Sequence, residues 1–324
     1  MKKILVTGGA GFIGSCLVKS LVGSSGEVVV FDNLERGSID RLNSIKDQIE
    51  IINGDIRDTK EVEKAVKGSD VIYHLAAVNG TENFYKHPKK VLEVGLKGIL
   101  NIMDASLKHN IENIVVASSA EVYQTPLKIP TPEEEMLKIP NPLEERYSYG
   151  ASKIASELVA FNWAREGNCV QVFRPHNIYG PNMGWKHVIP SLINKIIQIK
   201  KDGKTDLNIL GNGLQTRAFC YVDDLINGLH IMQSKGARNE LFHIGTQEEI
   251  SIKKLVEVIS ELMEIKVKII TSKAPKGETE KRCPDISKIR KLGYSPKFSI
   301  KDGLKMTIKW YLDNPFYLNK NKLL

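Results

Sequence analysis

The stretch Thr7-Gly8-Gly9-Ala10-Gly11-Phe12-Ile13-Gly14 lies where a short apolar run, Lys3 to Thr7, gives way to an amphipathic one. Its glycines fit both the spacing G-x-G-x-x-G and the variant G-x-x-G-x-x-G. Glycine permits a tight turn and lets backbone N–H groups approach an anion, while the N-terminus of a following helix adds partial positive charge. A strand, a glycine turn and a helix in this order predict an α/β fold whose first turn binds a diphosphate.

The rest of the first half alternates short apolar runs with longer amphipathic ones, which is the pattern of a parallel sheet covered by helices. The predicted strands are Lys3 to Thr7, Glu27 to Asp32, Ile49 to Asn53, Val71 to His74, Asn113 to Ser118 and Cys169 to Arg174. The predicted helices begin near Gly11, Asp58, Pro88 and Ser148. Six such repeats predict a Rossmann-type, doubly wound parallel sheet.

Prolines and glycines interrupt this pattern after Arg174, so the second half is expected to form a smaller α/β substrate-binding lobe over the carboxyl edge of the sheet. We expect residues 1–175 to form the Rossmann domain and residues 176–324 mainly the second lobe, with some segments returning to the first. Helices are expected at His187 to Lys200, Asp223 to Gln233, Ile252 to Met263 and Ile300 to Tyr311. The proline-rich stretch from Thr125 to Pro142, which contains Glu133, Glu134 and Glu135, is expected to be a solvated surface loop rather than a lid.

Composition excludes several classes of protein. The 324 residues carry a net charge of +8 from scattered lysines without a dense basic block, which indicates solvation rather than nucleic-acid binding. The four cysteines form no Cys-x-x-Cys pair and the histidines show no metal-ligand spacing, so we expect a reducing compartment, no disulfide and no metal. No apolar run reaches about 18 residues and no leader precedes the first strand, so the expected location is the cytoplasm.

Asp32 identifies the expected ligand of the glycine turn. It ends the second predicted strand, 21 residues past Gly11, where a carboxylate accepts hydrogen bonds from an adenosine ribose and repels a 2′-phosphate. NAD is therefore favoured over NADP, with the nearby Arg36 as the one reservation. The residues expected to bind NAD are Gly8, Gly11, Phe12, Ile13, Gly14, Asp32, Asn33, Asp55, Ile56, Leu75, Ala76, Ala77 and Lys153.

Tyr149 and Lys153 are four positions apart, which places both on one face of a predicted helix. An ammonium beside a phenol lowers the phenol pKa from about 10, so the tyrosine is expected to take a proton from a substrate hydroxyl near neutral pH. Tyr85 and Lys89 show the same spacing, but Pro88 lies between them and is expected to start a helix. Only the first pair therefore predicts a proton relay.

The fifth predicted strand ends in Ser118-Ser119-Ala120-Glu121-Val122-Tyr123, an unusually polar end for an apolar run. The carboxyl ends of parallel strands meet at the ligand-binding edge of such a sheet. Ser118, Ser119 and Glu121 are therefore expected to face the reacting substrate beside Tyr149.

With these motifs assembled, the chain resembles the extended short-chain dehydrogenase/reductase family, in its nucleotide-sugar epimerase, dehydratase and decarboxylase branch. The resemblance covers nearly the whole length. It rests on residues 7–14, 32–34, 54–56, 74–77, 118–123, 147–153, 174–181, 216–219, 221–224 and 283–285. It implies a nucleoside-diphosphate sugar as substrate, contacted by Asn177, Arg217 and Arg282, although each arginine alone can equally be a surface ion pair. It also implies a homodimer formed through helices near Val91 to His109 and Ser148 to Arg165.

The resemblance further implies that the reaction begins with NAD-dependent oxidation of the sugar at C4, with Tyr149 as base, Lys153 beside it and Ser119 sharing the hydrogen bond to the oxygen. Release of the 4-keto sugar (C4 dehydrogenase) or its reduction (4-epimerase) is the first expectation. A 4,6-dehydratase that uses Glu121, and a uronic acid decarboxylase, are the alternatives. Ala120 stands where many dehydratases carry an aspartic acid, which lowers the dehydratase alternative.

Other questions stay open at this level. Gly95 stands where the family often has asparagine, which affects how the cofactor is held. A cofactor-sensing regulator without catalysis is the hypothesis from another class, and the presence of both Tyr149 and Lys153 argues against it. The nucleotide base, the sugar, the fate of the keto sugar and the pathway, for which surface polysaccharide biosynthesis is the expectation, are not decided by the sequence.

Overall fold

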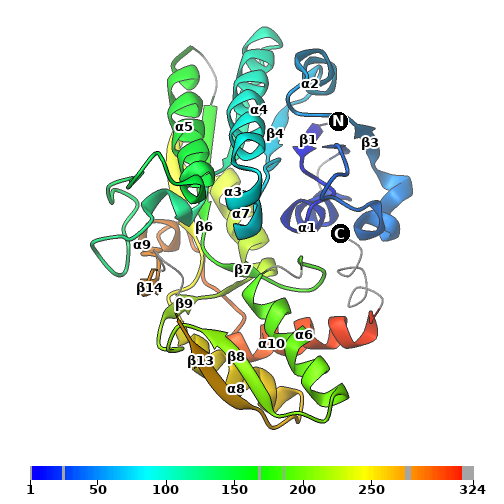
Figure 1. Ribbon diagram of the computed structural model, residues 1–324. Helices are drawn as coiled ribbons and strands as arrows, with labels where there is room; N and C mark the ends of the chain where they lie inside the picture. The colour runs from blue at the N-terminus through cyan, green and yellow to red at the C-terminus, as the bar shows by residue number, and fades with distance from the viewer. Residues whose placement is uncertain (1, 24–25, 167–168, 185–186, 274–278, 316–324) are drawn as a thin grey trace.

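A seven-stranded sheet, in which every pair of neighbouring strands is parallel, organises the molecule (Figure 1). In spatial order its strands are β11 (Glu240–Ile244), β6 (Cys169–Pro175), β5 (Asn113–Ala117), β4 (Val71–His74), β1 (Lys3–Thr7), β2 (Glu27–Asp32) and β3 (Glu50–Asn53). The computed structural model describes residues 2–23, 26–166, 169–184, 187–273 and 279–315, so the last nine residues of the second predicted segment lie outside it. The expected Rossmann-type sheet is confirmed.

One strand of this sheet was not expected from the sequence. The prediction of six strands was wrong because β11, from the second half of the chain, pairs with β6 along Glu240 to Ile244. Its run of five residues begins with a glutamate and contains a histidine, and it lies after the point at which prolines and glycines interrupt the regular alternation of the first half. His243 is nevertheless fully buried, because its ring bonds to Tyr123 and to the carbonyl of Asp285.

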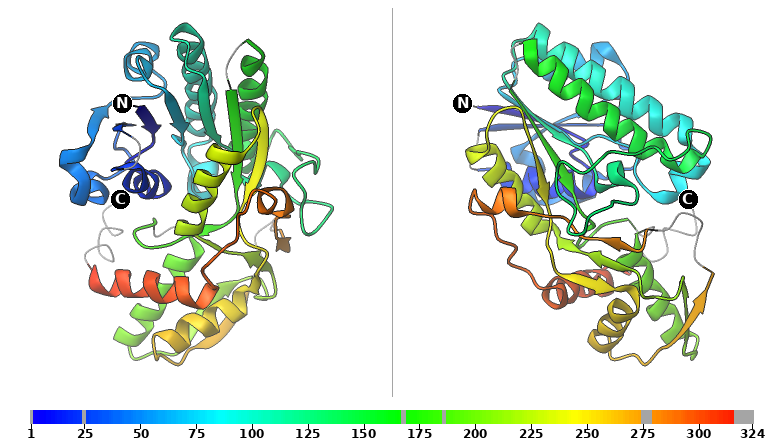
Figure 2. Two further views of the ribbon diagram at one scale, coloured as in Figure 1. Left: turned by 180° about the vertical axis from the view of Figure 1, so that it is seen from behind. Right: turned by 90° about the vertical axis from the view of Figure 1, so that its left-hand side faces the viewer.

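Helices cover both faces of the sheet, which is why its strands read as continuous apolar runs. On one face lie α2 (Thr59–Val66), α4 (Pro88–Lys108) and α5 (Ser148–Trp163), and on the other lie α1 (Phe12–Leu21) and α7 (Val222–Lys235) (Figure 2). Within β1, Ile4 and Val6 enter the core under α1, while Leu5 enters the core under α4. The side view shows α4 and α5 packed side by side along the outside of the sheet.

The second lobe lies at the carboxyl edge of the sheet. Its helices are α6 (Val188–Lys201), α8 (Ile252–Leu262) and α10 (Ile300–Asp313). Its strand pairs and triplet are β8 (Asp206–Leu210) with β13 (Lys268–Ser272), β7 (Ile178–Tyr179) with β10 (Cys220–Tyr221), and β9 (Thr216–Ala218) with β12 (Glu249–Ser251) and β14 (Lys281–Arg282). The four helices expected after Arg174 are confirmed to within two residues at each end.

Short elements connect these layers. The short α-helices are α3 (Thr81–Lys86) and α9 (Ser287–Arg290), and the 3-10 helices are η1 (Ile39–Gln48), η2 (Ala120–Tyr123), η3 (Glu145–Tyr147) and η4 (Ala164–Glu166). The helix α3 ends before His87 and α4 starts at Pro88, so Tyr85 and Lys89 lie on different helices, as expected. The tyrosine–lysine spacing at that position therefore has no catalytic meaning.

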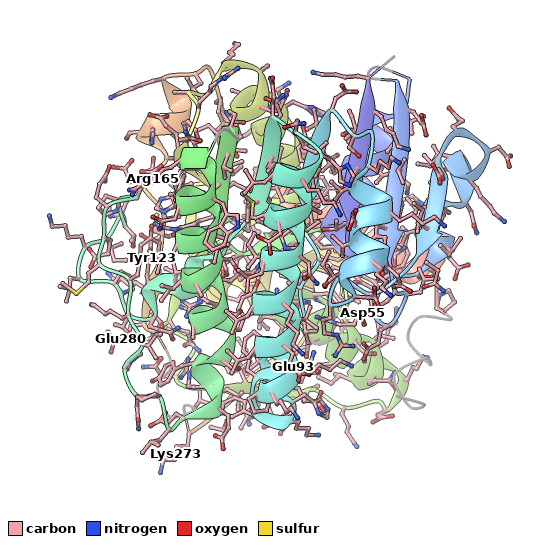
Figure 3. The ribbon with its side chains drawn as sticks, turned by 90° about the horizontal axis from the view of Figure 1, so that it is seen from above. Asp55, Glu93, Tyr123, Arg165, Lys273 and Glu280 are labelled. Atoms are coloured by element: carbon pink, nitrogen blue, oxygen red, sulfur yellow. The ribbon has the colours of Figure 1, made fainter. Side chains whose placement is uncertain are left out.

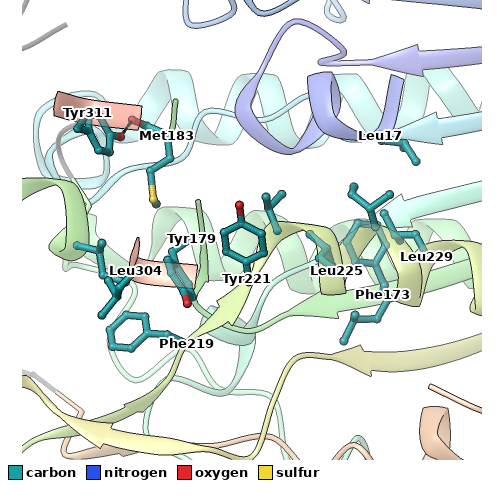
Figure 4. Packing of buried hydrophobic residues seen from close by; sticks show 14 of the residues in the cluster. Leu17, Phe173, Tyr179, Met183, Phe219, Tyr221, Leu225, Leu229, Leu304 and Tyr311 are labelled. Carbon is teal, nitrogen blue, oxygen red and sulfur yellow. Dashed lines mark hydrogen bonds between the residues drawn. The ribbon is translucent and has the colours of Figure 1, made fainter. Parts of the chain in front are cut away.

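The two lobes share one hydrophobic core (Figure 4). Tyr179, Phe219 and Tyr221 pack edge to face at the junction, with ring centroids 6.3 and 5.6 Å apart. Leu304 of α10 lies against them, and Leu225 of α7 continues the cluster toward the sheet. Because this core is continuous, the second lobe is fixed over the end of the sheet where the site forms.

The expected loop from Thr125 to Pro142 lies on the surface, but it is more firmly held than a solvated excursion. The Glu133 carboxylate accepts the backbone N–H of His243 at 3.0 Å, and its carbonyl accepts Arg174 Nη1 at 2.8 Å. The Glu135 side chain is buried and accepts the N–H of Leu127. The simple solvated interpretation of these glutamates is therefore wrong, since two of the three bind backbone groups.

Candidate functional site

The glycine turn packs so closely that side chains are excluded from it. Gly8 has φ of +71°, and a Cβ there would lie 2.8 Å from the N atom of Ala76. A Cβ at Gly14 would lie 2.1 Å from the carbonyl oxygen of Gly8. Gly11 caps α1, so the free N–H groups of the first helical turn point out of this turn toward the carboxyl edge of the sheet. The geometry is that of an anion cradle at a helix N-terminus.

Asp32 is held beside this cradle at the end of β2. Its Oδ2 accepts the N–H of Ala10 at 3.0 Å and its Oδ1 accepts the N–H of Leu34 at 2.9 Å. Burial raises the pKa of Asp32, while these two N–H groups and the nearby Arg41 oppose the rise. Each oxygen keeps a lone pair for a ribose hydroxyl, as the sequence predicts.

A cavity of about 430 Å³ runs from the glycine turn along the carboxyl edge of the sheet to Tyr149. This volume lies within the ordinary range for small-molecule sites. Every residue expected to bind NAD lines the cavity, together with all four expected catalytic residues, Asn177 and Arg282. Sequence positions 8 to 282 are thus brought to one site by the parallel sheet and the lobe above it.

Asp55 lines the cavity with a partner that the sequence did not indicate. Arg57 donates from Nε to Oδ1 at 2.9 Å and from Nη2 to Oδ2 at 2.7 Å, and it also reaches Glu93 of α4. Asp55 and Glu93 lie on the same side of the sheet (Figure 3). The hydrogen bonds from Arg57 lower the pKa of Asp55 to about 2, so this carboxylate is a fixed acceptor in the cavity.

Tyr149 and Lys153 lie on one face of α5, but in this structure they do not form the expected relay. Lys153 Nζ donates to the carbonyl of Ala117 at 2.7 Å and lies 5.8 Å from the centre of the Tyr149 ring. Burial raises the pKa of Tyr149 to about 12, with Ser119 and Arg36 opposing the rise and Glu121 adding to it. Burial also lowers the pKa of Lys153 to about 8, against the charge of Glu157.

The expected lowering of the tyrosine pKa is therefore not found here. The physical reason is that burial of Tyr149 outweighs its neighbours, while the Lys153 ammonium is directed at a carbonyl and not at the phenol. The lysine is still close enough to the ring to turn toward a ligand hydroxyl placed between them. Tyr149 and Lys153 are thus close enough to share a ligand hydroxyl. Without a ligand, however, the lysine is bonded to the Ala117 carbonyl and the phenol stays protonated.

Phe84 of α3 is a site residue that the sequence analysis missed. Its ring stacks on that of Tyr149, with centroids 4.8 Å apart and planes 10° apart. Both residues belong to a small buried cluster with Val91 of α4. The stack fixes the plane of the phenol. No local pattern could have shown it, because the contact joins helices that are 65 positions apart in the chain.

The two serines at the end of β5 have different surroundings. The Ser119 hydroxyl accepts the N–H of Glu121 at 3.2 Å, and its interaction with the Tyr149 phenol opposes the rise in the pKa of Tyr149. Ser119 therefore lies beside Tyr149 in the cavity, as expected. The Ser118 hydroxyl instead donates to Glu157 of α5, which also binds Arg174 through two hydrogen bonds. Ser118 lines the cavity, as expected, but it is only 2% exposed and its hydroxyl is engaged by Glu157, so in this structure it holds β5 against α5.

Glu121 and Arg282 form a two-pronged ion pair across the two lobes. Arg282 Nη2 donates to Oε2 at 3.2 Å, and Nη1 donates to Oε1. Burial favours protonation of Glu121, but the Arg282 charge, with smaller effects from Arg146 and Arg217, outweighs it and lowers the pKa of the carboxyl. The expected base and the expected diphosphate ligand thus neutralise each other in this structure.

The remaining expected substrate contacts differ in placement. Asn177 lines the cavity with φ of +43°, and its side-chain amide donates to the carbonyl of Ala218 at 3.3 Å. Arg217 donates to the carbonyls of Thr216 and Glu280 on β9 and beside β14. The described lining of the cavity does not include it, although its charge is felt at Glu121.

Gly95 has a structural reason that the sequence did not reveal. A Cβ at this position of α4 would lie 2.7 Å from Ser152 Cβ and 2.8 Å from its Oγ. The glycine therefore lets α4 approach α5 one turn along from Tyr149, at a distance that an asparagine would prevent. Gly95 therefore influences the site indirectly, because it sets how closely α4 packs against α5, the helix that carries Tyr149 and Lys153.

Among the residues that the structure describes, no group of three or more histidine, cysteine, aspartate or glutamate side chains is arranged so that it could hold a metal ion. Within the same residues, no helix is long and apolar enough to cross a membrane.

Comparison with known proteins fits this geometry. Residues 4–245 match the NAD dependent epimerase/dehydratase family. The chain belongs to this family. A UDP-N-acetyl-alpha-D-glucosaminuronate decarboxylase from Bacillus cytotoxicus is 32% identical over 322 residues, which cover 96% of this chain and 98% of that protein.

Two solved structures share the fold along nearly the whole chain. The dTDP-glucose 4,6-dehydratase DesIV from Streptomyces venezuelae, with NAD and TYD bound, has a TM-score of 0.88 at 28% identity, covering 98% of this chain and 99% of that one. UDP-glucose 4-epimerase from Thermotoga maritima, with UDP-glucose, has a TM-score of 0.87 at 28% identity, covering 97% and 99%. This member of the epimerase/dehydratase family is an enzyme, and NAD is its cofactor.

The residues present suit that cofactor. The glycine turn leaves room only for backbone against a diphosphate, and Asp32 presents its carboxylate where a 2′-phosphate would be repelled. Leu75, Ala76 and Ala77 line the path between the turn and Tyr149 with short or apolar side chains. In this member of the epimerase/dehydratase family the cavity therefore leads from the glycine turn and Asp32 to the tyrosine and lysine of α5.

Proposed function

We propose that this enzyme oxidises C4 of a nucleoside-diphosphate sugar, UDP- or GDP-linked, and that the 4-keto sugar is then released or reduced again. The observation that carries the proposal is that Tyr149, Lys153 and Ser119 converge at one end of the NAD cavity, where a substrate hydroxyl can reach all three. Bound NAD supplies the hydride acceptor. The family members named above act on nucleotide sugars by their names, which supports this substrate class.

The roles of the residues follow from their contacts. A C4 hydroxyl placed between Tyr149 and Ser119 exchanges hydrogen bonds with both, and Tyr149 takes its proton as the carbon is oxidised. Lys153 then leaves the carbonyl of Ala117 for the ligand, where its charge favours the phenolate. Phe84 keeps the phenol in the plane that this transfer needs.

Ala120 favours release or renewed reduction of the 4-keto sugar over its dehydration. Removal of the C6 hydroxyl from a 4-keto sugar requires a proton donor beside that group, and Ala120 lines the cavity with a methyl group. Glu121 is a carboxylate held by Arg282, so it is not a ready acid. Dehydration is therefore proposed only as a minor alternative, and release or renewed reduction of the keto sugar as the main outcome.

Decarboxylation of a uronic acid is the second candidate. Arg282 lies at the reacting end of the cavity, and its planar fork binds one carboxylate already, that of Glu121. The same fork can hold a C6 carboxylate of a sugar, whose loss after oxidation at C4 needs no acid at position 120. The Bacillus cytotoxicus relative is named for a reaction of this type.

A single incubation separates these outcomes. The purified protein is mixed with UDP-glucose, UDP-N-acetylglucosamine, UDP-glucuronic acid and GDP-mannose in D2O, and the products are followed by NADH absorbance and NMR. Epimerisation gives a C4 epimer without net NADH, release gives a ketone with stoichiometric NADH, and decarboxylation gives CO2 and a pentose. A new C6 methyl group, together with deuterium incorporated into the sugar, would refute the main proposal in favour of dehydration. Absence of any turnover with all sugars, with NAD bound, would reject C4 oxidation of these substrates.

Surroundings and assembly complete the proposal. We propose a cytoplasmic homodimer that serves surface polysaccharide biosynthesis and pairs through α4 and α5. Leu100 of α4 and Leu158 of α5 are 36% and 60% exposed on the side away from the sheet, which supports an apolar contact there. The four cysteines are free thiols, which suits a reducing compartment.

A further inference from the structure

Arg36 has no assigned role, although it lines the cofactor cavity. It follows β2 in the turn that begins with Asp32, and its side chain is exposed. Its Nη2 lies 3.6 Å from the point that a Cβ would occupy at Gly80, in the segment that follows β4. The side chain thus starts in the segment after β2 and ends beside Gly80, at the start of α3 and six residues past the end of β4.

The order of strands shows what lies beneath it. The sheet runs β4-β1-β2, so the segments that follow β2 and β4 flank the carboxyl end of β1, and the Arg36 side chain reaches from the first of these segments to the second. The glycine turn is at that end. The backbone of the next residue, Gly37, lies against both Asp32 and the glycine turn, because a Cβ there would lie 2.7 Å from Asp32 Oδ1 and 2.9 Å from the Cβ of Ala10. Arg36 therefore lines the cavity between the glycine turn and the site end, and its charge is also felt at Tyr149 and His187.

The charges around the cavity leave this arginine without a partner. Arg282 is paired with Glu121, Arg41 donates to the carbonyls of Ala10 and Asn182, and Lys153 donates to that of Ala117. The remaining acids are engaged as well. Glu35 pairs with Lys90, Asp55 with Arg57, and Asp32 with two backbone N–H groups. Among the cations of the described lining, only Arg36 makes no hydrogen bond or ion pair to a protein group.

We propose that Arg36 binds the diphosphate of NAD from above, opposite the glycine turn, so that the two phosphates are held between backbone N–H groups and a guanidinium. The glycine turn and the helix N-terminus offer only partial charges, and a diphosphate carries two negative charges. A planar guanidinium completes the cradle with two parallel hydrogen bonds. The direction of Arg36, across β1 toward Gly80, turns it away from a 2′-phosphate beside Asp32.

Binding measurements on the protein freed of nucleotide test this proposal without any sugar turnover. The dissociation constants of NAD, NADP and UDP are measured by calorimetry for the wild type, Arg36→Gln, Arg36→Lys and Arg238→Gln. Arg238 is an exposed arginine away from the cavity, so its variant is the matched control for net charge. Because Arg36 holds no protein group, the Arg36 variants are expected to fold, which circular dichroism checks.

The expected result is that Arg36→Gln weakens NAD about 10- to 100-fold, as loss of charge-assisted hydrogen bonds does. Arg36→Lys should lose less affinity for NAD than Arg36→Gln, and Arg238→Gln should keep the wild-type affinity. The affinity of the NAD-loaded protein for UDP should not change in any of these variants. The salt dependence of NAD binding should also become shallower in Arg36→Gln. Unchanged NAD affinity overturns the proposal. So does a loss confined to NADP, which would place Arg36 on a 2′-phosphate, or a loss confined to UDP, which would place it on the sugar nucleotide.

Discussion

Replacement of Gly95 by alanine adds one methyl group at the closest approach of α4 and α5, and its effect depends on a single neighbour. The new Cβ would lie 2.7 Å from Ser152 Cβ, a distance at which one of the helices must shift. Overpacking of this kind costs about 1–3 kcal/mol of stability, and alanine regains about 1 kcal/mol over glycine in a helix interior. The net expectation for Gly95→Ala is a loss of about 0–2 kcal/mol.

The sign should reverse when the neighbour is removed. In a Ser152→Gly background the nearest remaining atom of residue 152 is its Cα, 3.9 Å from the new Cβ, which is an ordinary contact. The overpacking is then absent and only the helix propensity remains. Gly95→Ala should therefore stabilise that background by about 1 kcal/mol. The coupling energy between the two sites is expected to be about 1–3 kcal/mol.

The assay is urea unfolding of the wild type, both single variants and the double variant, compared at a common m value. Ser152→Ala is the matched control. It keeps the Cβ and removes only the hydroxyl, so Gly95→Ala should still destabilise it. Strictly additive changes in the free energy of unfolding would refute the reasoning, because they would mean that Ser152 does not limit the approach of α4 to α5.

Four further predictions concern the site. Tyr149→Phe should abolish sugar oxidation while leaving NAD affinity within about twofold, and activity near wild type would reject the relay. Since burial lowers the pKa of Lys153 to about 8 against 10.5 in the unfolded chain, the unfolded state binds more protons at this group between pH 8 and 10, so the free energy of unfolding of the wild type relative to Lys153→Met, measured by urea unfolding, should rise with pH there. Gly14→Ala should lose NAD binding in calorimetry, because its Cβ would meet the Gly8 carbonyl at 2.1 Å. Glu121→Gln should leave C4 oxidation detectable by NADH absorbance and, because it frees Arg282 for a substrate carboxylate, should not lower any decarboxylation of UDP-glucuronic acid; loss of both activities would show that Glu121 supports the first step.

The sequence was sufficient where function depends on neighbours in the chain. The glycine turn, the strand after it and Asp32 all lie in the first repeat, so their spacing alone was enough to predict that they lie together, and they line one end of the cavity. The same holds for Tyr149 and Lys153, whose shared face follows from the helix period. The boundaries of β1 and the start of α4 at Pro88 were likewise predictable from local signals.

What the sequence could not show are the contacts between distant segments. The stack of Phe84 on Tyr149, the pairing of Glu121 with Arg282 and the turn of Ser118 toward Glu157 each join segments separated by 39 to 161 positions. The pKa of Tyr149 was misjudged for the same reason, because burial is a property of the whole fold. The strand β11 was missed because its buried histidine is paired only by residues from three other segments.

The position of β11 at the edge of the sheet also governs how the chain can be divided. Residues 240–244 complete the sheet only after the intervening segments of the second lobe have been made, so during synthesis β6 must wait with one edge unpaired. A fragment that ends at residue 175 would keep that edge open, with Val172 and Phe173 no longer covered by their partner strand. Such a fragment should aggregate rather than fold. The nucleotide site is built largely by the first repeats, but these repeats are thus expected to fold only together with the second half of the chain.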